Sequence, residues 1–407
     1  MNASRQRGVV AVLFTFALFA VAALAGLALD SSHLGTNKAR LQTVLDAAAL
    51  AAAKTLDQTG STTAATAAAN ATLTTNRNAF PELAAAGGLS ISIQYSNTLL
   101  PFSPGTTPAQ FVRVTATNFN TAMSLLRVAG VQQVGLRASA VSGMRPIGSD
   151  PPADVCKIAP MMVCGTPGAG PPSYGYALNA VHVLKSGPSA TVGPGNFHLV
   201  RLGGNGASDV RENLAGAYPG CVADGNNLET EPGNNSGPTS QGLNTRFGEY
   251  QGGGVNAATY PPDVVTRLPS PILTYNKTTN TIRQGSTVVT QASQINYNYT
   301  TYSNEVAAAN YTNPPAPGGN GVFQRRELAL PIADCSGKLN GQSTVPILGF
   351  ACFFLLQKAQ GQGNDSFVYG QVIQSCAGSG HPSPNAPQNS MGPHVIQLYR
   401  DAASPDS

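Results

Sequence analysis

The sequence predicts an α+β fold, in which a long N-terminal transmembrane helix and a small antiparallel sheet precede a loop-rich, mostly β C-terminal region. Three observations predict it. Residues 9–29 form an uncharged apolar segment, and apolar side chains then recur at helical spacing to residue 56. From residue 89 the period changes to two, which is typical of half-buried strands. Beyond residue 147, short strand-like segments alternate with Gly- and Pro-rich turns.

The apolar segment is long enough to span a bilayer. As a helix, residues 9–29 would extend about 30 Å, the thickness of the hydrocarbon layer. No other apolar segment approaches about 18 residues in length, so we expect a single span with the lipid bilayer as its partner. The predicted anchor side chains are Val9, Leu13, Phe14, Phe16, Leu18, Phe19, Leu24 and Leu29.

Two basic residues set the expected orientation of this helix. Arg5 and Arg7 lie just before the apolar segment, and positive charge favours the cytoplasmic side. We therefore expect residues 1–8 in the cytoplasm and residues 30–407 across the membrane. The alternative is a cleaved signal peptide, for which Ala23-Leu24-Ala25 offers an A-x-A site. The apolar segment is longer than the usual signal core, which favours a retained anchor.

The helical pattern continues beyond Asp30. Leu41, Leu45, Ala48 and Ala52 recur on one face and are the predicted helix-packing residues. An Ala-rich helix lets a neighbouring helix approach closely. The alternative is that this face packs on its own domain. Residues 59–78 are expected to be helical as well, with a break near Gly60.

A small antiparallel sheet is expected next. Residues 89–95, 111–117 and 131–142 read as strands, and residues 122–128 as a short helical turn or an edge. A hinge rich in Gly, Pro and Asp at 147–152 suggests a boundary, which makes residues 30–146 one domain.

The remainder is divided into a loop-rich β region (147–320), a compact β subdomain (321–400) and a tail (401–407). Residues 345–357 are the most apolar stretch after the anchor, but they are too short to span a bilayer. Pro346 and Gly349 argue against a helix, so we expect a buried core strand. Residues 367–373 and 394–400 are expected to pair with it.

The chain has six cysteines, all after residue 150. An even number beyond a membrane segment favours disulfides in an oxidising compartment over buried free thiols. Six cysteines permit 15 pairings, which the sequence does not resolve. The pair Cys156–Cys164 is the closest local candidate. The candidate disulfide residues are Cys156, Cys164, Cys221, Cys335, Cys352 and Cys376.

Charge and motifs argue against several functions. The net charge is +4 and no basic block occurs, which gives no support for a nucleic-acid partner. The chain contains no G-x-S-x-G string and no CxxC pair, and Gly203-Gly204-Asn205-Gly206 is not followed by a phosphate-binding Lys. We therefore predict no enzymatic activity, no cofactor and no metal.

Several polar side chains have two possible roles. For Asp209, Glu212, Glu229 and Glu231, solvated loop carboxylates are favoured over a cation site. His182 and His198 lie in apparent strands, where a structural or exposed role is favoured over catalysis. For Arg246, a structural role that holds loop carbonyls or pairs with Glu231 is favoured over binding of a partner or sugar.

The N-terminal segment resembles the TadE/TadG-like proteins of the tight-adherence (Flp) pilus system. The resemblance covers roughly the first 55 residues. More weakly, residues 156–164, 194–197 and 242–247 are similar to stretches in larger TadG-like proteins. The residues that carry the main resemblance are Arg5, Arg7 and Gly8, the closing Asp30, Arg40-Leu41-Gln42, and Asp46-Ala47-Ala48-Ala49-Leu50-Ala51.

This resemblance implies a pilin-like helix and a structural, membrane-anchored accessory or minor-pilin-like subunit of pilus assembly. It implies a single-pass protein of the bacterial inner membrane, with other Tad assembly subunits or pilins as partners. Prepilin substrates carry Glu five residues after the Gly, whereas Leu13 stands here. No Asp-x-Ser-x-Ser metal-adhesion string occurs. The alternative function is a membrane-anchored extracytoplasmic adhesin or carbohydrate-binding module, with contacts from loops such as 297–302.

Overall fold

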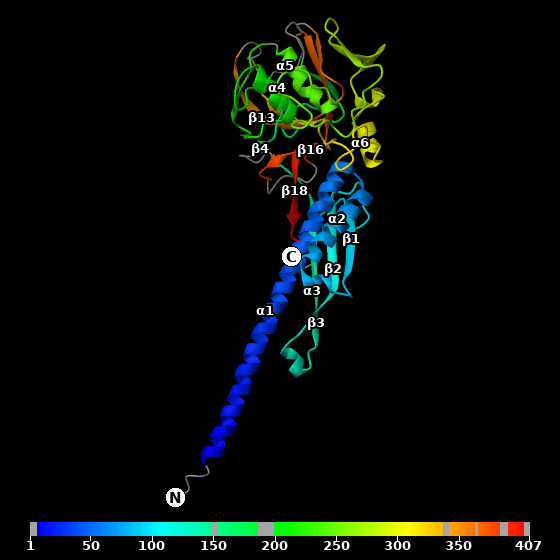
Figure 1. Cartoon of the computed structure of the whole chain (residues 1–407). Helices are drawn as coiled ribbons and strands as arrows, with labels where there is room; N and C mark the ends of the chain where they lie inside the picture. The colour runs from blue at the N-terminus through cyan, green and yellow to red at the C-terminus, as the bar shows by residue number, and fades with distance from the viewer. Residues whose placement is uncertain are drawn as a thin grey trace. The chain divides into compact units, whose positions relative to one another are not determined.

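The computed structural model describes residues 6–147, 154–185, 199–233, 235–336, 342–362, 365–382 and 390–402. It has the predicted α+β fold, with one long N-terminal helix followed by a largely β region (Figure 1). The chain forms two compact units. Unit 1 comprises Met1–Asp57, Ser61–Gly143 and Ile396–Ser407, and unit 2 comprises Gln58–Gly60 and Met144–Val395.

Helix α1 (Gln6–Thr59) dominates unit 1 and is 54 residues long. It ends before Gly60, whose φ of 64° is left-handed and suits glycine. Ser61 then caps α2 (Thr62–Asn78) by accepting a hydrogen bond from the Ala64 amide at 3.3 Å. The predicted break near Gly60 is confirmed. A short helix, α3 (Pro81–Ala84), follows.

The sheet of unit 1 is antiparallel where β1 (Ser90–Ser96), β2 (Phe111–Ala122) and β3 (Gln133–Pro146) pair in sequence. The three predicted strands are confirmed. Between β2 and β3 lies a 3-10 turn, η1 (Leu126–Ala129). Alternate side chains of β2, such as Val112 and Val114, are buried against the helices.

The last strand, β18 (Gly392–Tyr399), joins this sheet beside β3. The strand order is β1-β2-β3-β18-β16, in which β16 comprises Ser375–Ala377. The predicted pairing of residues 394–400 with the apolar strand 345–357 is therefore wrong. The local sequence of β18 does not specify which sheet it joins, and the choice depends on long-range packing. Within unit 1, the Ser142 hydroxyl donates to the Gln397 carbonyl at 2.9 Å, and the rings of Phe111 and Tyr399 meet edge to face.

Unit 2 is built around a seven-stranded sheet. Its main path is β14-β15-β13-β12-β5, while β6 pairs with β15 and β8 pairs with β13. The strands of this sheet are β5 (Val163–Cys164), β6 (Val181–Lys185), β8 (Asn227–Glu229), β12 (Glu327–Ala333), β13 (Thr344–Leu355), β14 (Gln360–Gln362) and β15 (Asp365–Ile373).

Strand β13 is the predicted apolar core strand, and it is buried on both faces. Phe354 belongs to one hydrophobic cluster and Phe353 to the other, because successive side chains of a strand point to opposite faces. This explains why residues 345–356 are continuously apolar instead of alternating. The predicted pairing of residues 367–373 with this strand is also confirmed.

Smaller sheets and helices surround this core. Helices α4 (Ala207–Gly216) and α5 (Ser236–Asn244) contribute to the cluster that contains Phe353, and α6 (Tyr299–Ala307) contributes to the cluster that contains Phe354. The smaller strands are β4 (Asp154–Cys156), β7 (Cys221–Ala223), β9 (Leu273–Asn276), β10 (Thr281–Gln284), β11 (Thr287–Val289), β16 (Ser375–Ala377) and β17 (Ser379–Gly380). The helices and 3-10 turns are η2 (Pro167–Ala169), α4 (Ala207–Gly216), α5 (Ser236–Asn244), η3 (Thr245–Phe247), η4 (Ala292–Gln294) and α6 (Tyr299–Ala307).

The six cysteines form three disulfides, all within unit 2. They are Cys156–Cys221, Cys164–Cys335 and Cys352–Cys376. The local candidate Cys156–Cys164 is wrong, because Cys156 lies directly opposite Cys221 in the β4–β7 pair. Cys164 instead lies on β5, beside the strand that precedes Cys335.

Candidate functional site

The apolar half of α1 is exposed along its length. Among the described residues, α1 is one helix long and apolar enough to cross a membrane, with a mean hydropathy of 2.5 in its most apolar window. Arg5 lies outside the described residues, as do the side chains of Arg7 and Val9. The other predicted anchor side chains are all exposed: Leu13, Phe14, Phe16, Leu18, Phe19, Leu24 and Leu29.

Two positions near the end of this apolar half are buried, and both face the connection between β2 and β3. At Gly26, a Cβ atom would lie 2.9 Å from the Cβ of Leu125, so only glycine lets the two segments approach this closely. One turn later, Asp30 is 2% exposed although it carries a charge. Its carboxylate accepts hydrogen bonds from three successive amides, those of Ser124 (3.1 Å), Leu125 (3.0 Å) and Leu126 (2.6 Å).

These amides lie at the start of η1, where no backbone partner satisfies them. Asp30 therefore acts as the cap of η1 from a distant part of the chain, and charge-assisted bonds of this kind are stronger than neutral ones. The sequence identified Asp30 only as the residue that closes the apolar segment. Its partner could not be found from local pattern, because the two segments are 94 to 96 residues apart.

A second polar contact lies one turn further along α1. The His33 ring nitrogen is 2.8 Å from a carboxylate oxygen of Glu82, which lies in α3. The Asn37 amide donates to the other oxygen of the same carboxylate. The hydrogen bond with His33, followed by that from Asn37, lowers the pKa of Glu82.

The predicted helix-packing residues continue the same face of α1. Leu41, Leu45, Ala48 and Ala52 are all buried in the core of unit 1, against α2 and the sheet. The structure therefore supports the alternative in which this face packs on its own domain. Gly26, Asp30, His33 and Asn37 lead into it at helical spacing, so one stripe of α1 runs from the end of the apolar half into the core of unit 1.

In unit 2, Arg246 is buried and holds backbone carbonyls. Its Nε and Nη2 atoms donate to the Leu214 carbonyl at 3.2 and 2.7 Å, and Nη1 donates to the Arg325 carbonyl. Burial lowers its pKa well below the ordinary value. The structural role is supported, but the suggested pairing with Glu231 is wrong, since Glu231 accepts from Arg201 at 2.7 Å.

Arg326 is fully buried at the centre of the same unit. Its guanidinium donates to four carbonyls, those of Val265, Arg267, Leu355 and Leu356, at 2.9 to 3.1 Å. The rings of Phe247 and Phe354 lie 4.7 and 4.4 Å from its Cζ atom, a cation–π arrangement. Burial lowers the pKa of this guanidinium.

Asp263 supplies the nearby negative charge. It accepts from the Arg326 amide at 3.0 Å, from the Val265 amide at 2.9 Å and from the Tyr302 hydroxyl at 3.0 Å. Burial raises the pKa of Asp263, while the Arg326 charge opposes that shift. Tyr297 and Tyr302 are both buried near Arg326. The expectation that residues 297–302 present aromatic contacts to a ligand is therefore wrong.

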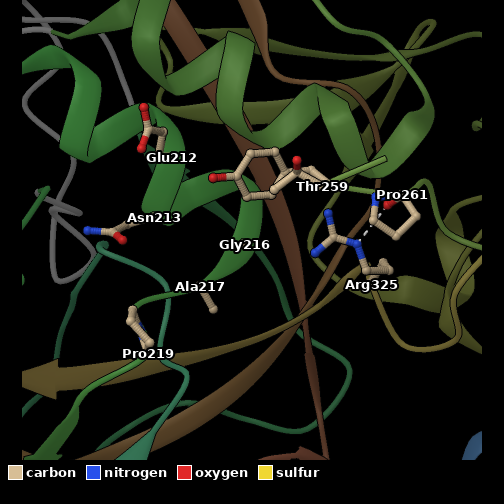
Figure 2. Close-up of a pocket in the computed structure, with 9 residues that line it drawn as sticks. Glu212, Asn213, Gly216, Ala217, Pro219, Thr259, Pro261 and Arg325 are labelled. Carbon is tan, nitrogen blue, oxygen red and sulfur yellow. Dashed lines mark hydrogen bonds between the residues drawn. The ribbon is translucent and has the colours of Figure 1, made fainter. Parts of the chain in front are cut away.

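Unit 2 also has a surface pocket of about 440 Å³ (Figure 2). Arg325 lies in its wall, where its guanidinium donates to the carbonyls of Pro261 (2.9 Å) and Ala215 (2.8 Å). Burial lowers the pKa of Arg325. Glu212 supplies a carboxylate to the same pocket, so both charge signs are present. The remaining lining residues are Asn213, Gly216, Ala217, Pro219, Thr259, Tyr260 and Pro261.

The other polar side chains considered from the sequence do not come together in a single site. Glu229 and Glu231 pair with Arg201, whereas Glu212 lines the pocket. Within the part of the chain that the structure describes, no three His, Cys, Asp or Glu side chains are grouped as metal ligands. Burial lowers the pKa of His182 to about 4, and its ring packs edge to face on Tyr176. His198 lies outside the described residues.

Comparison with known proteins bears on the N-terminal segment. Residues 8–55 match the family model described as "Putative Flp pilus-assembly TadE/G-like". Neither the curated proteins nor the solved structures give a match. The matched residues include both the apolar half of α1 and the stripe from Gly26 to Ala52. The chain thus carries a TadE/G-like domain at residues 8–55, as the resemblance of its N-terminal segment indicated.

Proposed function

We propose that this chain is a membrane-anchored accessory or minor-pilin-like component of Tad (Flp) pilus assembly, with a structural and non-catalytic role. The observation that carries the proposal is the family match at residues 8–55, the segment that includes the exposed apolar helix. In this proposal α1 holds the protein in the bacterial inner membrane. Other Tad subunits or pilins are its partners.

The disulfides support a location outside the cytoplasm. Three disulfides in unit 2 fit an oxidising compartment, because cytosolic thiols are kept reduced. The basic residues before the apolar segment favour a cytoplasmic N-terminus. Together these features support a single-pass protein whose two units lie in the periplasm or at the cell surface.

The buried polar groups of unit 2 support a structural role. The guanidinium groups of Arg246 and Arg326 donate hydrogen bonds to backbone carbonyls of the same unit. A guanidinium held in this way fixes loops in place and has few donors left for a substrate. The unit can therefore present a rigid surface to neighbouring subunits.

Deletion and complementation test this proposal. Loss of the gene is expected to abolish or strongly reduce surface fibres counted by electron microscopy, and the full chain is expected to restore them. A matched variant replaces residues 1–25 with a cleavable signal peptide, so that both units are secreted without an anchor. This variant is expected to fail. Normal fibres in the deletion strain would contradict the proposal.

The pocket of unit 2 favours one second candidate, an anchored extracytoplasmic adhesin or carbohydrate-binding module. Its volume of about 440 Å³ suits a small polar ligand, and Glu212 and Tyr260 line it. The same deletion strain separates the two functions, since intact fibres with lost attachment would favour binding. The variant Glu212→Ala should then reduce attachment and leave the fibres unchanged.

A further inference from the structure

The connection between β2 and β3 exposes apolar side chains at its end. We call residues 124–131 the hairpin tip. Val128 is 91% exposed, the highest value among the large apolar side chains that the structure describes, and Leu125 and Val131 are 45% and 40% exposed. Exposed apolar side chains grouped in one short turn mark a contact surface.

The hairpin tip is built as a defined structure. The Met123 amide donates to the Gln132 carbonyl at 3.0 Å, which closes the hairpin below the tip. Gly130 ends η1 with a φ of 91°, a left-handed conformation that suits glycine. The carboxylate of Asp30 holds the three amides at the start of the turn. The exposure of Val128 is thus imposed by a fixed turn.

Contacts with α1 fix the level of the hairpin tip along the membrane-spanning helix. Leu125 packs on Gly26, which lies inside the apolar segment. Gly26 precedes Asp30 by about 6 Å along the helix axis. The tip therefore lies at the last apolar turn of α1, which is where the hydrocarbon layer meets the headgroups if α1 is the membrane anchor of the proposed function. In Figure 1, the connection between β2 and β3 lies at the lower end of these strands, and the N-terminal part of α1 continues below it.

We propose that the hairpin tip inserts into the outer interface of the bilayer beside α1, so that unit 1 contacts the membrane at two points. The occupant of its apolar surface is lipid, because that surface is continuous with the lipid-facing side of the helix. Leu125, Val128 and Val131 reach the acyl boundary. The contact limits the tilt and rotation of unit 1 relative to the membrane.

Charge around the hairpin tip suits a lipid surface. Asp30, the carboxylate that meets the tip, is buried, whereas Arg137, four residues after β3 begins, is exposed. Arg127 is within the tip and is exposed. Its long apolar stem lets the guanidinium reach headgroup phosphates while its neighbours enter the apolar layer. A carboxylate at this position would instead be repelled by anionic headgroups.

The chain contains no tryptophan, so a single introduced Trp reports its own surroundings. The full-length variant Val128→Trp is reconstituted into vesicles of phosphatidylethanolamine and phosphatidylglycerol that carry bromine at defined acyl positions. Leu100→Trp is the matched control. Leu100 is also an exposed aliphatic residue of unit 1, at 72%, but it lies before β2, whose 12 residues extend roughly 40 Å. Phe16→Trp reports whether α1 is inserted.

We expect Val128→Trp to show blue-shifted emission and strong quenching by bromine near the ester end of the acyl chain. Leu100→Trp should emit as in water and escape quenching, and Phe16→Trp should be quenched most by bromine deep in the chain. Solvent-like, unquenched emission from Val128→Trp with a quenched Phe16→Trp overturns the proposal and leaves the anchor intact. Blue-shifted emission without bromine quenching also overturns it, because the tip would then be covered by protein, such as a second copy.

Discussion

Unit 1 and unit 2 are stabilised by different kinds of interaction. Unit 1 has no cysteine, and its core is made mostly of small and aliphatic side chains from α1, α2 and the sheet. Unit 2 has three disulfides and two buried guanidinium groups, those of Arg246 and Arg326, that organise its loops. A loop-rich unit needs such devices, because its irregular backbone leaves many carbonyls to be satisfied.

This difference in stabilising interactions suits the two units to different environments. In unit 1, α1 is apolar and exposed at one end and buried in the protein core at the other, and the family match at residues 8–55 covers most of both parts. Unit 2 depends on cross-links that persist in an oxidising compartment. The comparison therefore predicts that chemical perturbations act on one unit and spare the other.

Reduction of the disulfides should have the largest effect. Each disulfide is expected to contribute about 2–4 kcal/mol to the stability of unit 2, with the larger value for Cys164–Cys335, which closes the longest loop. Amide hydrogen exchange of the full chain in nanodiscs, with and without reductant, measures this. Protection should fall throughout unit 2 and stay unchanged at Val112 and Val114 of unit 1. An equal loss in both units would contradict the comparison.

Removal of the buried Arg326 charge should have the next largest effect. The variant Arg326→Met leaves four carbonyls and Asp263 without their partner, and we expect unit 2 to lose about 3–5 kcal/mol. Chemical unfolding followed by near-ultraviolet circular dichroism measures this loss. Arg283→Met is the control, because this half-buried Arg donates to the nearby Ser286 carbonyl at the protein surface, and its effect should stay within about 0.5 kcal/mol.

In unit 1, the sensitive position is Asp30. The variant Asp30→Asn keeps the shape but removes the charge that holds the amides of Ser124, Leu125 and Leu126. We expect exchange of these amides to become about tenfold faster, since charge-assisted bonds are roughly twice as strong as neutral ones. Asp46→Asn is the matched control on the same helix. Unchanged exchange at the hairpin would refute the capping role.

Acid should produce the smallest effect, at the contact between α3 and α1. The pKa of Glu82 is lower in the folded protein than in the unfolded chain. The contact therefore stabilises the fold fully at pH values above the ordinary glutamate pKa, and its contribution is lost as the pH falls toward and through the lowered pKa of the folded protein. Thermal unfolding measured from pH 7 to pH 3 should show this contribution disappear. Glu82→Gln should be less stable at neutral pH and lack that part of the acid dependence. If the difference in stability between the unsubstituted protein and Glu82→Gln is the same at pH 3 as at pH 7, the Glu82 carboxylate does not stabilise this contact.

The elements that local pattern specifies were predictable. The length of α1, the break at Gly60 and the strands near residues 89, 111 and 131 follow from periodicity within one segment. The continuous apolar stretch 345–357 correctly indicated a strand buried on both faces. The TadE/G-like segment was recognisable because its residues are consecutive in sequence.

The features that join distant segments were not predictable. Asp30 meets amides more than 90 residues away, and Cys164 finds Cys335 at a separation of 171 residues. Strand β18 returns to the sheet of unit 1, which its own alternation does not reveal. Tyr297 and Tyr302 lie in an Asn- and Thr-rich stretch whose sequence indicates an exposed loop. In the structure both rings are buried and lie 5.6 and 5.5 Å from the Cζ atom of Arg326.

The central claim is that α1 is a retained anchor and that both units lie outside the cytoplasm. The most direct test places one protease-sensitive tag before residue 1 and another after residue 407, and treats intact spheroplasts with protease. If α1 is a retained anchor with this orientation, the C-terminal tag is removed while the N-terminal tag stays protected on a membrane-attached chain. Protection of the C-terminal tag, or absence of the N-terminal tag from the mature protein, would contradict it.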